Sequence, residues 1–182
     1  MSERRFPGQW VDPEDDPRRS DSNPVGERAT ILEYLEHYRQ TLEMKCDGLD
    51  AEQMAHRSVP PSTMSLLGLV RHLASVEHHW FRRVMEGNDV PRLYKSEDDS
   101  DLDFNGAVAD PAVVEDAWAS WRQEVSYARE YVEAVESLDV SGTLHGEAVA
   151  LRDVLVHLIE EYARHAGHAD LLRECIDGRT GQ

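Results

Sequence analysis

The stretch VLVHLIEEYARHAGHADLLRECI, residues 154–176, predicts a long amphipathic helix near the end of the chain. Its apolar residues recur every three or four positions, which is the spacing of one face of an α-helix. The helix is expected to span about residues 150–175, and Gly178 is a suitable stop because glycine adopts the left-handed conformation found after many helices. The expected inner face contains Val154, Leu158, Tyr162, Ala169, Leu172 and Ile176. Such a helix must bury this face against other elements.

Three further segments show the same periodicity. Long helices are expected at about residues 26–47, 62–86 and 111–138, with a short helical turn at about residues 50–56. No segment shows a convincing alternation of apolar and polar residues, which is the pattern of a half-buried strand. The four long helices are too polar on their outer faces to span a membrane. The pattern therefore predicts an all-α protein with a four-helix bundle fold.

Length and charge restrict the class of protein and its partners. The chain has 182 residues, enough for one domain, with 36 acidic against 19 basic residues and a formal net charge of −17. This charge repels phosphate backbones and anionic lipids, so neither nucleic acid nor a membrane surface is an expected partner. No apolar run approaches the ~20 residues of a membrane span, and we expect a cytoplasmic location. Cys46 and Cys175 are expected to be reduced thiols, although a disulfide between them is not ruled out.

The beginning of the chain differs in composition from the rest. Residues 1–24 contain four prolines among charged and small polar residues. We expect a tail that is either poorly ordered or laid over the surface. Residues 25–182 are expected to form the bundle domain.

Three side chains are candidate metal ligands. Glu161 and His165 lie one helical turn apart and therefore share a face of the last long helix. His72, on the second long helix, also borders the apolar stripe. Two imidazoles and one carboxylate from two helices suit a divalent metal with an open coordination position. The alternative is an ordinary Glu–His or Glu–Arg pair, since a buried carboxylate needs some partner.

Other histidines carry weaker signals. His168 is a candidate for orienting a ligand or moving a proton, with a capping or surface hydrogen bond as the alternative. His78 and His79 follow His72 on the same helix; His79 is placed to line the mouth of a pocket, but both are expected to be solvated.

An acidic segment has a partial calcium motif. Residues 101–106 match the first half of an EF-hand loop, but the twelfth position is Ala112 instead of the bidentate glutamate. We interpret the segment as a solvated connection between helices.

Two motifs resemble the DinB-like superfamily, and more closely an actinobacterial branch of it. They are LLGLVRHLASVEHHW, residues 66–80, and EEYARHAGHADLLRE, residues 160–174, in the order expected for that family. The resemblance covers about residues 26–180. It implies a four-helix bundle that holds a divalent metal through three residues of the second and fourth helices.

The ligands that the resemblance implies are His72, Glu161 and His165. Many relatives use three histidines, whereas this set is similar to the zinc site of mycothiol-dependent maleylpyruvate isomerase, which has an additional C-terminal domain. Zinc is the expected metal, with nickel, manganese and iron as alternatives.

The resemblance further implies a thiol S-transferase that joins a low-molecular-weight thiol such as mycothiol to an unknown electrophile. The alternatives are a metal-dependent hydrolase and a non-enzymatic, stress-associated binding bundle. A homodimer is compatible with all three and is common among relatives.

Overall fold

The computed structural model describes residues 8–19 and 23–181. Within these residues the protein is mostly helical, as predicted, with one small hairpin. The helices are α1 (Glu27–Cys46), α2 (Ala51–Ala55), α3 (Leu66–His78), its π-helical continuation η1 (His79–Met85), α4 (Leu102–Asn105), α5 (Pro111–Ala134) and α6 (Leu151–Asp177). The strands are β1 (Ser141–Leu144) and β2 (Glu147–Ala150).

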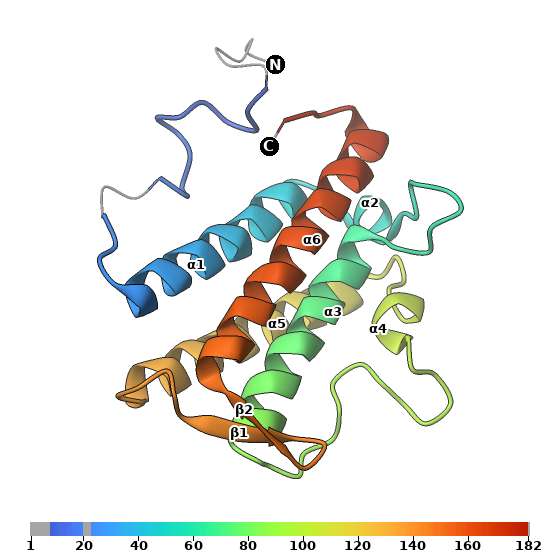
Figure 1. Ribbon diagram of the computed structural model, residues 1–182. Coiled ribbons are helices and arrows are strands. Elements are labelled where there is room, and N and C mark those ends of the chain that lie inside the picture. Colours follow the sequence, from blue (N-terminus) through green and yellow to red (C-terminus); the bar gives the residue numbers. More distant parts are fainter. Residues whose placement is uncertain (1–7, 20–22, 182) are drawn as a thin grey trace.

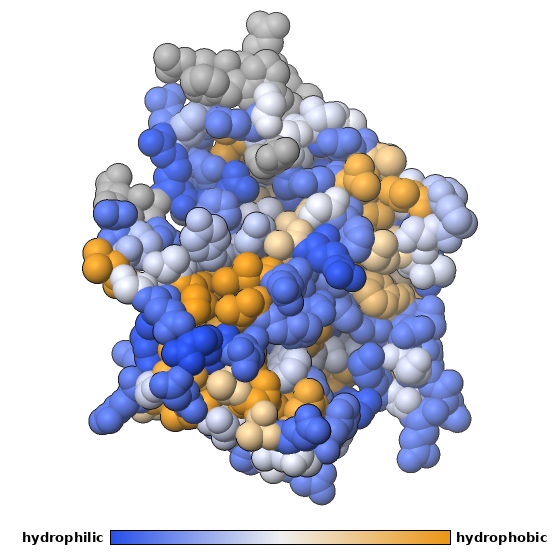
Figure 2. Space-filling model, viewed as in Figure 1, coloured by the Kyte–Doolittle hydropathy of each residue, from blue (hydrophilic) through white to orange (hydrophobic). Residues whose placement is uncertain are grey.

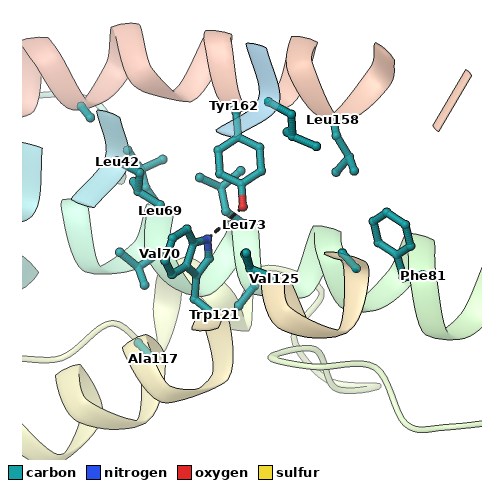
Figure 3. Close-up of a cluster of buried hydrophobic side chains, with 14 of the residues drawn as sticks. Leu42, Leu69, Val70, Leu73, Phe81, Ala117, Trp121, Val125, Leu158 and Tyr162 are labelled. Atoms are coloured by element: carbon teal, nitrogen blue, oxygen red, sulfur yellow. Dashed lines mark hydrogen bonds between the residues drawn. The ribbon is translucent and has the colours of Figure 1, made fainter. Parts of the chain in front are cut away.

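The long helices pack around a shared core. α6 lies against α1 on one side and α3 on the other, while α5 packs on α3 (Figure 1). The buried residues come from the inner faces that the apolar spacing predicts, because those faces cannot remain in water. Figure 3 shows Leu69, Leu73 and Val125 around Trp121 and Tyr162.

A chain of polar groups crosses this core. Trp121 Nε1 donates to the Tyr162 hydroxyl at 2.9 Å, and that hydroxyl donates to Glu77 Oε1, also at 2.9 Å. The buried Arg39 guanidinium donates two hydrogen bonds of 2.7 and 2.9 Å to the same oxygen. The carboxylate and the guanidinium are therefore buried as a pair, which avoids the large cost of an isolated buried charge.

The contact between α1 and α5 is looser. A groove of about 490 Å³ separates them, with Leu32, Leu35 and Leu155 among its apolar lining. Figure 2 shows apolar residues gathered between α1 and the first half of α6, surrounded by hydrophilic ones. Arg28 bridges one end of the groove through a 2.7 Å hydrogen bond to the Val132 carbonyl.

The hairpin corrects the expectation that the chain has no strands. Ser141 pairs with Ala150 in an antiparallel ladder, and the turn places both His145 and Gly146 at positive φ. Strands of four residues are too short to produce a clear alternation. The third long helix accordingly ends at Ala134, earlier than expected.

The hairpin also explains how α6 starts without a side-chain cap. The amide of Leu151 donates to the Val140 carbonyl at 2.8 Å, and that of Arg152 donates to the Leu138 carbonyl at 3.0 Å. The backbone before β1 therefore satisfies two of the free amides at the helix start.

Part of the N-terminal segment lies on the bundle. Trp10 is only 2% exposed, and its ring is contacted by Lys45 Nζ at 4.0 Å and by the Arg179 guanidinium at 3.8 Å. The expected tail extends over residues 1–24, of which 1–7 and 20–22 lie outside the described residues.

Candidate metal centre

The three side chains predicted as ligands converge between α3 and α6. His72 Nε2 lies 3.7 Å from Glu161 Oε2, and His165 Nε2 lies 3.5 Å from the same oxygen. One potential ligand atom from each residue lies within 4.8 Å of the others. The sequence-predicted set is thus brought together at one point, which is what a single cation requires.

His72 is held from the side opposite Glu161. Its Nδ1 donates a 2.8 Å hydrogen bond to Oδ2 of Asp103, a residue of α4 that is almost fully buried. The ring also stacks on Phe104 with centroids 5.2 Å apart. In the neutral imidazole, the proton on Nδ1 leaves the Nε2 lone pair facing Glu161, so this form of the ring has the tautomer and orientation of a metal ligand. In the protonated ring, Nε2 also carries a proton and faces the carboxylate as a donor.

Arg71 secures α4 in this position. Its Nε donates to the Asp103 carbonyl at 2.9 Å, and its Nη2 donates to the Leu102 carbonyl at 3.0 Å. Gly106 lies so close to this guanidinium that a Cβ there would approach Nη2 to 2.7 Å. The short helix is therefore attached to α3 next to the candidate site.

His165 is held by His168. The two Nδ1 atoms lie 3.3 Å apart, so one of them donates to the other. Donation by His165 leaves its Nε2 free to face Glu161. His168 thus contacts the candidate ligand from outside and is not part of the converging set.

The electrostatics of the site favour an ionised carboxylate. Hydrogen bonds from His165 and then His72 lower the pKa of Glu161 far below its usual range, against the opposing effect of burial. Burial lowers the pKa of His72, but hydrogen bonds to Asp103 and Glu161 outweigh it and raise the pKa above 6.5. Two nitrogen donors and one anionic oxygen therefore face one point, a donor set that suits zinc and similar divalent metals.

The interpretation of residues 101–106 as a solvated connection was wrong for Asp103. That residue lies on a short helix, and its carboxylate orients His72. The sequence showed a cluster of acids there but no sign of which one is buried.

The expectation that His78 is solvated was also wrong. It is buried, donates from Nε2 to the Pro91 carbonyl at 3.0 Å, and lies 3.4 Å from Glu124 through Nδ1. His79 is partly buried beside a separate cavity.

The helical fold and the converging His/Glu/His set are those expected of the DinB-like class of proteins. The mycothiol-S-transferase family model matches residues 30–178, and the chain belongs to that family. The crystal structure of the conserved protein of locus from Enterococcus faecalis is similar in fold, with a TM-score of 0.59, 16% identity, and coverage of 85% of this chain and 99% of that one. None of the curated proteins matches the sequence.

The helices within residues 8–19 and 23–181 include none with the length and apolar character of a membrane span.

Proposed function

We propose that this protein is a divalent-metal-dependent S-transferase that joins a low-molecular-weight thiol, such as mycothiol, to an electrophilic small molecule. Membership of the mycothiol-S-transferase family supports the reaction class. The observation that carries the proposal is the convergence of His72, Glu161 and His165. The same arrangement supports a DinB-type four-helix bundle formed by α1, α3, α5 and α6.

The proposed ligands are His72 Nε2, a Glu161 carboxylate oxygen and His165 Nε2, with zinc as the preferred metal. A free thiol has a pKa of about 8.5 and is only a few per cent ionised at neutral pH. A divalent metal held by these residues would lower the pKa of a coordinated thiol and so increase the fraction of reactive thiolate.

The chain's own side chains would position the reactants. Asp103 holds the His72 ring and His168 holds the His165 ring, so both imidazoles keep a fixed orientation. In the reaction the S–H bond breaks and a bond forms between the thiol sulfur and the electrophilic carbon. In a substitution the bond from that carbon to the leaving group breaks and the leaving group takes the proton, whereas in an addition a π bond of the electrophile opens and its far atom takes the proton. The proton-transfer role predicted for His168 stays a prediction.

Elemental analysis of protein purified without a His-tag tests the proposal. We expect one metal per chain, lost in Glu161→Ala and His165→Ala but retained in His56→Ala, which removes an exposed histidine. Electrophiles are then screened with mycothiol. A transferase consumes thiol and electrophile in equal amounts, whereas a hydrolase converts the electrophile without thiol. Absence of metal even after reconstitution would contradict the proposal.

A further inference from the structure

A second cavity, of about 210 Å³, lies at the junction of α3 and η1. Six basic side chains line it, and we call it the basic pocket: His78, His79, Arg83, Arg92, Lys95 and His145. They come from the end of α3 and from η1, from the segment that follows η1, and from the β1–β2 turn. Such a concentration of basic groups stands out in a chain whose formal net charge is −17.

The segment after η1 is held in place by side chains of the helix. Ser75 Oγ donates to the Leu93 carbonyl at 2.8 Å, and His78 Nε2 donates to the Pro91 carbonyl at 3.0 Å. Arg83 donates to the carbonyl of Val90. These three hydrogen bonds fix the backbone on both sides of Arg92, so the basic side chains of this segment extend from a backbone with a fixed position.

The hairpin closes another side of the pocket. Gly142 of β1 lies directly against the backbone of η1, so close that a Cβ there would collide with the carbonyl of Val84. This contact brings the β1–β2 turn to η1. His145, at the turn with φ of 52°, then lines the pocket together with His79.

No carboxylate is among the residues that line the pocket, although Glu124 lies 3.4 Å from His78 Nδ1 and Asp103 interacts electrostatically with Lys95. Among the described residues, no ion pair joins Arg83, Arg92 or Lys95 to a carboxylate; Lys95 donates to the Ser100 carbonyl at 2.9 Å. The pKa of His79 is lowered by burial first and then by the charges of Arg92 and Arg83. Because the lining carries basic groups and no carboxylate, we expect a positive field inside the pocket, opposite in sign to the charge of the whole protein.

The basic pocket and the candidate metal centre share the helix formed by α3 and η1. His72 and His79 are seven residues apart on nearly one helix face, a rise of about 10 Å. Aromatic side chains in contact lie between the two sites: the ring centroids of His79 and Trp80 are 5.5 Å apart, and those of Trp80 and His157 are 5.1 Å apart. His157 Nε2 lies 3.5 Å from Glu161 Oε1. A small molecule of several carbon atoms can span the rise of about 10 Å between His72 and His79.

We propose that the basic pocket binds an anionic oxygen group, carboxylate or phosphate, of the electrophilic substrate, while the reactive carbon of that substrate reaches the metal centre. This inference rests on the proposed transferase function. Arginine and lysine bind such groups through charge-assisted hydrogen bonds, and arginine can do so with two parallel bonds. A local positive field also overcomes the repulsion of anions by the acidic surface. The substrate class is therefore anionic electrophiles.

Titration of the metal-free, full-length protein with succinate and with methyl phosphate tests the proposal. The histidine Hε1 signals in NMR spectra report on binding. We expect saturable shifts of His79 and His145 with at least one of the two anions, and the tighter one identifies the anionic group. Succinamide, which lacks the charge, should cause none. In Arg92→Glu the affinity should fall about tenfold or more, because a charged hydrogen bond is lost and repulsion is added.

Arg57→Glu is the matched control, since Arg57 is also exposed and the substitution changes the net charge equally. It should bind both anions like the wild type. Absence of saturable shifts with both anions, or equal affinities of the Arg92→Glu and Arg57→Glu variants, would overturn the proposal. The titration needs neither metal nor thiol. If the transferase assay fails, the anion titration therefore still shows whether the basic pocket binds anions. If transfer is efficient with uncharged electrophiles only, the proposed substrate class is wrong although the transferase function holds.

Discussion

Asp103 Oδ2 accepts a 2.8 Å hydrogen bond from His72 Nδ1, although the two residues are 31 positions apart. This contact joins the short helix α4 to the candidate metal centre. In the neutral ring it leaves the Nε2 lone pair facing Glu161. Asp103 therefore orients a candidate ligand without belonging to the converging set.

Replacing Asp103 by Asn should weaken zinc binding by about 10- to 100-fold, because the carboxylate that orients His72 and increases its basicity is lost. Competition with a zinc-binding dye measures the affinity. Asp101→Asn is the control, since it makes the same chemical change at an exposed position of the same segment. Equal affinities of the two variants would show that Asp103 does not support the ligand.

The contribution of His72 and Glu161 to the stability of the metal-free protein should be largest between about pH 4.5 and 6.5. The raised pKa of His72 means that its protonated form stabilises the fold below about pH 6.5, and this contribution is lost as the pH rises through the folded-state pKa. The lowered pKa of Glu161 acts in the opposite sense: its contribution is present above about pH 4.5 and is lost as the pH falls through the folded-state value.

Thermal unfolding of metal-free protein across pH 4–9 tests this expectation. The difference in Tm between wild type and His72→Gln should decrease above pH 6.5. Zinc competes with the proton on His72, so the increase in Tm caused by zinc should grow over the same interval. A difference in Tm that is constant from pH 5 to 9 would contradict the assigned role of His72.

Local spacing predicted the helices and made His72, Glu161 and His165 candidates, and the resemblance to the DinB-like superfamily then favoured a metal over an ordinary ion pair. Apolar residues such as Leu69 and Leu73 mark the buried face of α3, and His72 lies at its edge. Glu161 and His165 are likewise placed by the helical repeat of α6. Residues on facing edges of two packed helices come together once the apolar faces are buried.

The features that were missed depend on tertiary contacts. Asp103 is one acid among many in its segment, and its burial follows from the bonds that Arg71 makes to the α4 backbone. The hairpin was missed because its strands are four residues long, although His145-Gly146 forms a turn with positive φ at both positions. The basic pocket combines residues from three separate segments, so spacing gave only the isolated hint that His79 could line a pocket mouth.

Replacing the buried Glu77 by Ala should reduce the free energy of unfolding by about 3–5 kcal/mol, because the Arg39 guanidinium would lose its buried partner and keep only the longer, 3.9 Å ion pair to Glu36. The Tyr162 hydroxyl would also lose its acceptor. Urea unfolding measures the change. Glu160→Ala, at a side chain that is 71% exposed, should change stability by less than about 0.5 kcal/mol. Similar stabilities of the two variants would mean that the core relaxes around Arg39.

Replacing Gly142 by Ala should destabilise the protein by about 1–3 kcal/mol, since a Cβ at this position would overlap the Val84 carbonyl and lie 2.8 Å from Met85 Cα. Both neighbours are backbone atoms of η1, so the hairpin itself must move. Gly167→Ala is the matched control: its Cβ meets no atom within 4 Å, and in the middle of α6 the change should stabilise the protein by about 0.5–1 kcal/mol. Urea unfolding should therefore give changes in the free energy of unfolding of opposite sign for the same chemical change.

Displacement of the hairpin should also weaken succinate binding in Gly142→Ala and not in Gly167→Ala, because the turn carries His145. Unchanged stability and succinate affinity in Gly142→Ala would show that the hairpin does not rest on η1 as described.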